Sequence, residues 1–235
     1  MVFLEEGMAC SRKYLACFLT LVFSFFSRDS FSKDHGSTQS HGFYEKCGIS
    51  LSFPKILDSV VNYQINPCLD SYIGKNGATL PLGMFLGGGQ NPSALENLPM
   101  LHIYRRNLDI AMASSNGSGI RGTEKGVVSS TTSSVERECG LSRRTTISKI
   151  RGSNWRGWIA EDFYKKNTSF ESPPEYCETF DEKNRCIRLI IGNNKETITM
   201  AQYCFVRRHE DFDLDAGLSY GIFMEVVNSI KLLDE

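Results

Sequence analysis

The clearest pattern of apolar and polar positions lies near the C-terminal end of the chain. Two apolar, strand-like runs at 186–191 and 197–206 are joined by the five residues 192–196 (GNNKE). A short polar connection between two such runs favours an antiparallel hairpin. After an acidic stretch, the segment 222–233 carries apolar residues near helical spacing. The pattern predicts a hairpin with a terminal helix laid across one face.

Further strands are predicted upstream of this hairpin. Residues 48–54 (GISLSFP) alternate apolar and polar side chains, which is typical of a half-buried strand. The segment 144–151 predicts another strand, and 152–164 a turn that leads into the next one. Residues 101–112 contain two short alternating runs, which indicate a hairpin or a bulged strand. We therefore predict an α+β fold, a mainly antiparallel sheet with a C-terminal helix packed on one face.

The N-terminal end has the layout of a secretory signal peptide. Arg12 and Lys13 precede an uncharged, mostly apolar run at 14–26. This run is too short to cross a bilayer core of ~30 Å as a helix. We interpret residues 1–27 as a signal peptide, with no stable membrane insertion after its cleavage. An uncleaved anchor and a buried N-terminal helix are the alternatives, and Met8 is an alternative start.

Composition divides the rest of the chain. Residues 28–42 are polar and rich in Ser, Gly and His, which predicts a flexible tail. Ser, Thr and Gly dominate 114–135, which we interpret as a loop or linker. It lies between an N-terminal α+β part at 43–113 and a C-terminal α+β part at 136–235. These parts are either two halves or one domain with an excursion.

Cysteine content agrees with export. Six cysteines follow the leader, at positions 47, 68, 139, 177, 186 and 204. An even number in an exported chain suggests disulfides. Cys177 and Cys186 bracket a short polar loop, so we expect them to pair; buried free thiols are the alternative. Because C-x-x-C is missing and the four histidines are scattered, we expect no zinc site.

Charge and glycine content give no sign of nucleic acid or a cofactor. The formal net charge is −1, so no general attraction to nucleic acid or to an anionic membrane exists. Residues 87–89 are three glycines, but neither G-K-[ST] nor G-x-G-x-x-G accompanies them. We expect no bound phosphate and no cofactor.

Two short motifs resemble known chemistry without completing it. Ser219 lies in a G-x-S-x-G sequence at 217–221, the motif of the nucleophile elbow of α/β-hydrolases. That fold requires a catalytic histidine after the serine, and no histidine follows Ser219. We interpret this segment as the start of the terminal helix. The acidic residues at 211–215 resemble half of a calcium loop, but Ile222 stands where a bidentate glutamate is needed. We therefore expect no catalytic residue and no metal site.

Aromatic residues beside an arginine form the candidate surface. We choose Trp155, Arg156 and Trp158 as interface residues, since aromatic and arginine side chains are frequent anchors of protein interfaces. The same aromatics are alternatively part of the core. Glu161 and Asp162 beside them are the acidic pair that a glycan hydrolase could use.

The segment 147–233 resembles the PsbP-like α+β fold. The resemblance rests on an aromatic-glycine strand at 155–158, on two further strands, and on a closing helix with F-x-x-V-x-x-S-I-K at 223–231. Members of that fold mostly serve in binding or assembly. The resemblance would imply that the chain has no catalytic residues.

The residues at 47–54 resemble the opening of bacterial immunity proteins that neutralise type VI lipase effectors in the periplasm. Cys47 and Gly48 precede an alternating strand that ends at Pro54, as in that family. The arginine-aromatic element that usually lies in this opening is missing. The resemblance would imply a protein whose function is a surface.

These observations lead to one expected function and two alternatives. We expect an exported, non-enzymatic binding protein, periplasmic or secreted, that acts through a protein-protein interface. An inhibitor or immunity protein of a bacterial effector toxin fits this description. A secreted hydrolase of glycans or esters is the second hypothesis, and an envelope-complex assembly factor is the third.

Overall fold

The computed structural model describes residues 47–57, 69–70, 77–82, 99–129, 134–166, 174–180, 184–206 and 219–233. The chain divides into two units, Met1–Ser37 and Thr38–Glu235, and all described residues belong to the second. The expected signal peptide at 1–27, the tail at 28–42 and the acidic turn at 211–215 lie outside the described residues.

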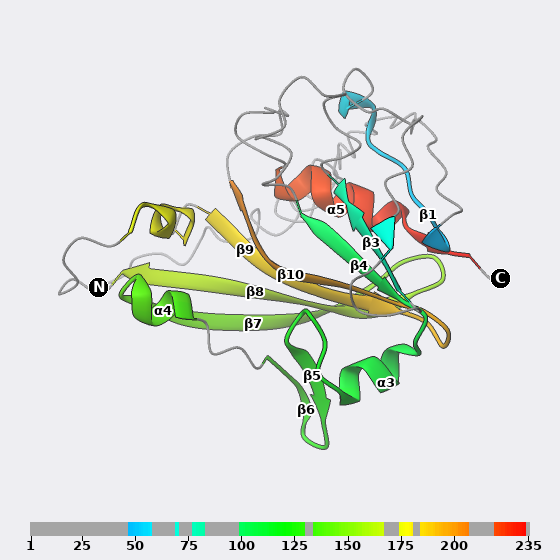
Figure 1. The fold of residues 1–235 in the computed structure, drawn as a ribbon, viewed down its shortest axis with the longest axis horizontal. Coiled ribbons are helices and arrows are strands. Elements are labelled where there is room, and N and C mark those ends of the chain that lie inside the picture. Colours follow the sequence, from blue (N-terminus) through cyan, green and yellow to red (C-terminus); the bar gives the residue numbers. More distant parts are fainter. Residues whose placement is uncertain are drawn as a thin grey trace, which may run out of the picture. The chain divides into compact units, whose positions relative to one another are not determined.

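A seven-stranded antiparallel sheet forms the centre of the second unit (Figure 1). Its strands, in spatial order, are β2 (Leu69–Asp70), β3 (Gly77–Pro81), β4 (Met100–Tyr104), β10 (Thr197–Val206), β9 (Asn184–Gly192), β8 (Arg156–Lys166) and β7 (Leu141–Arg151). Because β4 pairs with β10, both halves of the chain build one sheet. The predicted antiparallel sheet is confirmed, and the structure is richer in strands than expected.

The hairpin predicted from the C-terminal pattern is β9 and β10. Its turn is held by Asn193, whose Oδ1 accepts hydrogen bonds from the backbone N–H groups of Lys195 and Glu196 at 2.8 Å each. Farther along, the register shifts between Met200 and Tyr203, which marks a bulge in β10.

The terminal helix α5, Tyr220–Ser229, covers one face of the sheet, as predicted (Figure 1). It ends earlier than the apolar pattern suggested, because the chain continues as strand β11, Lys231–Leu232, which pairs with β1, Ile49–Ser50. Two side chains from the β7–β8 turn hold this C-terminal segment. Asn154 Nδ2 donates to the carbonyl of Leu232 at 2.5 Å, and Trp155 Nε1 donates to the carbonyl of Ile230 at 2.8 Å.

The alternating segment at 48–54 is a strand only in part. β1 takes two of its residues, and a short 3-10 helix, η2 (Lys55–Leu57), follows. Ile49, Leu51 and Phe53 are nevertheless all fully buried, as the alternation predicted. They belong to the large core cluster between the sheet and α5.

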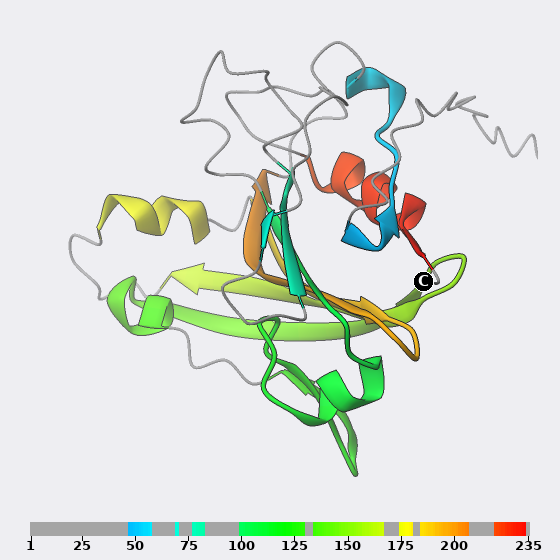
Figure 2. The ribbon, with the colours of Figure 1, turned by 45° about the vertical axis from the view of Figure 1, so that its right-hand side comes forward.

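The opposite face of the sheet carries α3 (Leu108–Ala113) and a hairpin of β5 (Ile120–Thr123) and β6 (Gly126–Ser129) (Figure 2). Their apolar side chains pack on Ala160 and Ile190 of the sheet and form a second core cluster. The helices on the two faces of the sheet, α5 and α3, have ten and six residues. No helix in the described part of the chain is long and apolar enough to cross a membrane.

The second half of the segment 101–112 is helical, so the predicted hairpin or bulged strand is wrong there. Asn107 caps α3, since its Oδ1 accepts a hydrogen bond from the backbone N–H of Asp109 at 2.7 Å. Leu108, Ala111 and Met112 are buried at helical spacing. The short apolar run fits both periods, and the cap decides for the helix.

The segment 114–135, expected to be a loop or linker, instead contains the β5–β6 hairpin and the start of α4 (Ser134–Glu138). Some of its polar side chains hydrogen-bond to the local backbone. Asn116 Nδ2 donates to the carbonyl of Ala111 at 3.0 Å and to that of Ile120 at 2.9 Å. Ser118 is fully buried. A composition typical of linkers therefore builds an ordered element here.

Two disulfides between described cysteines lie in a third cluster, near α4 and the 3-10 helix η4 (Glu175–Phe180). Cys139 is bonded to Cys177, and Cys186 to Cys204. The expected Cys177–Cys186 pair is therefore wrong. Cys186 lies directly opposite Cys204 across the β9–β10 hairpin, so closeness in the sheet outweighs closeness in sequence. Cys47 is also disulfide-bonded.

Candidate functional site

Trp155, one of the three expected interface residues, belongs to the core. Its side chain is 4% exposed, and its indole N–H donates to the Ile230 carbonyl at 2.8 Å. Trp155 thus connects the β7–β8 turn to the end of α5. Its ring is buried and its N–H is hydrogen-bonded within the protein. The expectation that Trp155 anchors a partner at the surface is therefore wrong.

Arg156 and Trp158 lie on the face of the sheet that α3 covers. Arg156 Nη2 donates to both carboxylate oxygens of Asp109 on α3, at 2.7 and 2.8 Å. Trp158 is half-buried against the cluster that contains the apolar side chains of α3. Ile110, on the same helix, is 60% exposed. We call Asp109, Ile110, Arg156 and Trp158 the α3 surface.

The neighbouring strand β7 extends the α3 surface with positive charge. Lys149 lies opposite Trp158 in the β7–β8 register, and Arg151 lies opposite Arg156. Residues directly opposite each other in an antiparallel pair share one face of the sheet. Lys149 and Arg151 are both exposed. The α3 surface and its β7 border therefore combine an apolar side chain, an aromatic ring and several cations.

The acidic pair considered for a hydrolase does not converge. Glu161 and Asp162 are consecutive residues of β8, so their side chains point to opposite faces of the sheet. Glu161 accepts a hydrogen bond from Arg185 Nη2 at 2.8 Å. Asp162 forms an ion pair with Arg188 on the other face. The two carboxylates cannot flank one scissile bond.

Asp162 is the centre of a buried polar network. Arg188 Nε and Nη2 donate to its two carboxylate oxygens at 2.9 and 2.8 Å. Thr145 Oγ1 and Gln202 Nε2 donate to the same carboxylate at 2.6 Å each. Gln202 Nε2 also donates to the hydroxyl of Tyr164 at 2.6 Å. Four donors satisfy the carboxylate, so the network has the character of a structural ion pair.

Arg188 is the sequence signal that could have revealed this network. It interrupts the apolar run 186–191, and a charge in a buried strand requires a partner. The sequence pattern suggested Asp162 only as a member of an acidic pair, so the partner was missed. Burial raises the pKa of Tyr164 next to this network, while the hydrogen bond from Gln202 acts in the opposite direction.

His102 is the one histidine among the described residues, and it lies on the same face as the buried network. Its Nδ1 is 3.2 Å from Thr79 Oγ1 on β3, and Thr199 is its register partner on β10. Burial lowers the pKa of His102. In the described part of the chain, no group of three His, Cys, Asp or Glu side chains is placed to hold a metal ion.

Ser219 of the G-x-S-x-G sequence is a helix cap. Its Oγ accepts a hydrogen bond from the backbone N–H of Ile222 at 3.3 Å, and the residue has the extended backbone typical of an N-cap. The residue is 8% exposed. For its described residues, 219–221, the interpretation of this segment as the start of the terminal helix is confirmed.

Comparison with protein-family models, with curated proteins and with solved structures found no match. The PsbP-like and immunity-protein resemblances therefore rest on the quoted sequence features. The α3 surface is the candidate site, because it unites two of the three expected interface residues with a neighbouring helix.

Proposed function

We propose that this protein is an exported, non-enzymatic binding protein that acts through a protein-protein interface on the α3 surface. The observation that carries the proposal is that α3 bears the exposed Ile110 next to Asp109, the residue that Arg156 binds, while Trp158 packs on the cluster formed by the buried side of the same helix. Energetically dominant interface residues are enriched in tryptophan and arginine, and a neighbouring apolar side chain extends the area that a partner can bury.

Two disulfides support the exported location. Bonds such as Cys139–Cys177 and Cys186–Cys204 persist in oxidising compartments and are rare in the reducing cytosol. A periplasmic or secreted site of action is consistent with them. The proposed signal peptide supplies the route of export.

The finer proposal is an inhibitor or immunity protein of a bacterial effector toxin. A disulfide-linked sheet presents its surface with little loss of conformational entropy on binding, which favours tight inhibition. An assembly factor of an envelope complex would use a similar surface. The two differ in partner: a single toxin supports inhibition, whereas a membrane complex supports assembly.

Affinity purification from envelope extract tests the proposal. We expect wild-type protein to retain a specific partner, and Ile110→Asp and Arg156→Ala each to lose most of it, because both remove contacts that a partner would bury. Val128 on β6 is an exposed apolar residue outside the α3 surface, at 41% exposure, so Val128→Asp is the matched control. Retention of the partner by the Ile110 and Arg156 variants would contradict this assignment.

A further inference from the structure

The strand β7 is a long, regular sheet edge. It comes last in the spatial order, and its eleven residues pair continuously with β8 without a register shift. Among the described strands, none pairs with its other side. Figures 1 and 2 show β7 running along the margin of the sheet. Bulges and short length, which commonly protect edge strands, are both missing from β7.

The adjoining turn defines which backbone groups of β7 point away from the sheet. The N–H of Gly152 donates to the carbonyl of Trp155 at 3.0 Å, so these two residues form a hydrogen-bonded pair. Such pairs alternate with non-hydrogen-bonded pairs along an antiparallel ladder. The N–H and C=O groups of Thr145, Ile147, Lys149 and Arg151 therefore point outward. The N–H and C=O groups of the residues between them form hydrogen bonds with β8.

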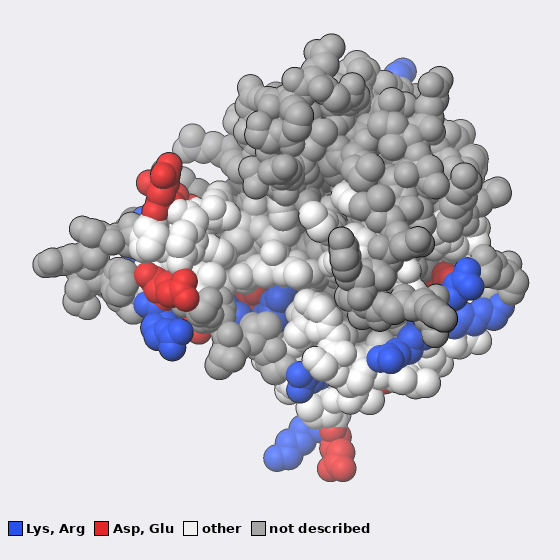
Figure 3. Space-filling model, viewed as in Figure 1, with Lys and Arg blue, Asp and Glu red and all other residues white. Residues whose placement is uncertain are grey.

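The edge strand β7 is basic. Its sequence, LSRRTTISKIR, contains four basic residues and no acidic one. Arg143 is bound to Glu136 of α4 at 2.6 Å, so the positive charge offered to a partner comes from the other three. Lys149 and Arg151 are exposed, and Arg156 lies directly opposite Arg151. Figure 3 shows basic side chains gathered toward the end of the molecule where α3 and the β9–β10 turn lie. An incoming strand would meet backbone groups that no described strand pairs with, together with positive charge.

We propose that β7 binds an extended, acidic segment of the protein partner as an additional antiparallel strand. The proposal rests on the proposed function and specifies how the partner is held. Main-chain hydrogen bonds supply affinity in this mode, and side chains along the strand supply specificity. A second copy of the chain is the poorer occupant, because pairing β7 with β7 would place two basic strands side by side.

Amide hydrogen exchange by NMR, on the full chain, gives a direct test. The probe is an eleven-residue peptide of alternating Val and Glu, matched to the length of β7. We expect it to slow exchange at Thr145, Ile147, Lys149 and Arg151. The intervening amides, already bonded to β8, should exchange slowly with and without it. A peptide with Lys in place of Glu is the control and should change nothing.

Substitutions at Lys149 separate the backbone contribution from the charge. Lys149→Pro removes an outward donor without breaking the bonds to β8, as proline at a sheet edge allows. We expect it to lower the affinity for the Glu peptide by about tenfold, the upper range for the loss of one hydrogen bond. Lys149→Gln keeps the donor and should weaken binding less. Lys149→Glu combined with Arg151→Glu should reverse the preference, toward the Lys peptide.

The outcomes separate the edge-strand mode from the proposed function. Unchanged exchange at the four outward amides with the Glu peptide overturns the edge-strand mode, as does equal binding of both peptides. If amide exchange slows as the protein concentration rises in the absence of peptide, the occupant of β7 is a second copy of the chain. That result also overturns the edge-strand mode. If the α3 surface variants lose the partner while the peptide has no effect, the proposed function stands and only the edge-strand mode fails.

Discussion

Asp162 and Arg188 form a salt bridge in which both side chains are almost completely removed from solvent, at 0% and 2% exposure. Asp162→Asn removes the carboxylate charge and leaves the guanidinium buried without compensation. We expect this substitution to lower the free energy of unfolding by about 3–5 kcal/mol. Urea unfolding followed by circular dichroism measures the change.

Glu161→Gln is the matched control for that substitution, because Glu161 pairs with Arg185 at a partly exposed site. Because water reaches this pair, the loss should be smaller than for Asp162→Asn. Replacing both members of the buried pair, as Asp162→Leu with Arg188→Met, should recover much of the stability. Equal losses for Asp162→Asn and Glu161→Gln would show that burial does not set the cost.

His102 makes stability depend on pH. Burial lowers its pKa below the usual 6.5, so the folded state binds a proton less readily than the unfolded state does. The free energy of unfolding should therefore be highest above that value and fall as the pH drops through the folded-state pKa. His102→Asn should flatten the profile in denaturant titrations below pH 6.5. An unchanged slope would assign the effect to other groups.

At the scale of single elements, caps decide where helices begin. Ser219→Ala removes the side-chain oxygen that accepts the N–H of Ile222 at the start of α5. We expect a loss of about 1 kcal/mol in unfolding free energy, measured by thermal or urea unfolding. A reaction that used Ser219 as a nucleophile would be lost in the same variant. A lower stability with unchanged binding of the protein partner supports the capping role.

Gly221, two residues farther on, provides the control for that experiment. A Cβ at this position meets nothing within 4 Å in the described structure. Gly221→Ala should therefore be neutral or stabilise α5 by up to about 1 kcal/mol, because alanine restricts the unfolded chain. Destabilisation by both substitutions would indicate that the helix start depends on more than the cap.

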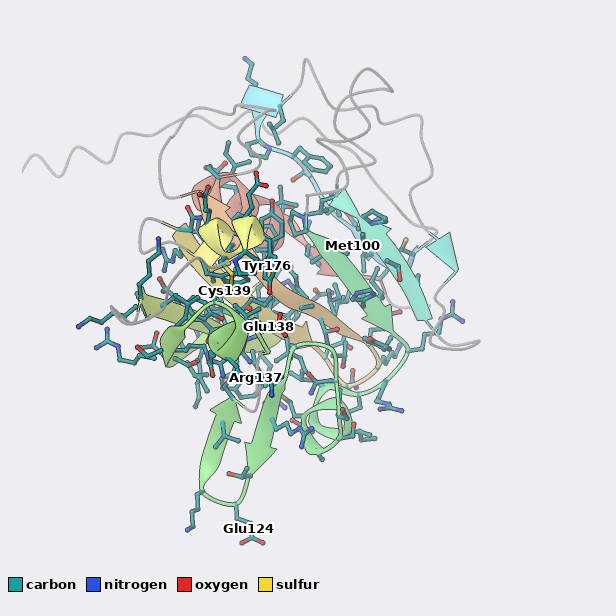
Figure 4. All side chains as sticks on the ribbon, turned by 60° about the vertical axis from the view of Figure 1, so that its left-hand side comes forward. Met100, Glu124, Arg137, Glu138, Cys139 and Tyr176 are labelled. Atoms are coloured by element: carbon teal, nitrogen blue, oxygen red, sulfur yellow. A yellow bond between two sulfur atoms is a disulfide. The ribbon has the colours of Figure 1, made fainter. Side chains whose placement is uncertain are left out.

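At the scale of the whole molecule, the Cys139–Cys177 disulfide anchors η4 beside α4. Figure 4 shows Cys139, Glu138 and Tyr176 together there, and Tyr176 donates a hydrogen bond to Glu138 Oε2 at 2.5 Å. We expect peptide mapping under non-reducing conditions to recover Cys139–Cys177 and Cys186–Cys204. A peptide that joins Cys177 to Cys186 would contradict the structure.

Removal of that bridge measures what it contributes. Cys139→Ser with Cys177→Ser opens a link between residues 38 apart, which should cost about 3–4 kcal/mol in the free energy of unfolding. The comparison variant lacks Cys186–Cys204, which joins residues 18 apart, and should lose slightly less. A negligible loss in both would indicate that sheet packing alone holds this end of the molecule.

Local pattern was sufficient for much of the fold. The alternation at 48–54 identified the buried residues, and the C-terminal pattern identified the β9–β10 hairpin and the buried side of α5. Of the candidate interface, Arg156 and Trp158 came from the sequence. Each of these signals depends on a repeat or cluster within a few neighbouring residues, which a linear sequence displays directly.

Contacts between distant segments were decided only by the tertiary structure. Three examples are the disulfides of Cys177 and Cys186, the contact of Trp155 with the end of α5, and the bond from Arg156 to Asp109. Each of these contacts joins residues that are far apart in the chain. Strand register and turn geometry set these contacts. A repeat of two or of 3.6 residues states which side of an element is buried, but not which element it meets.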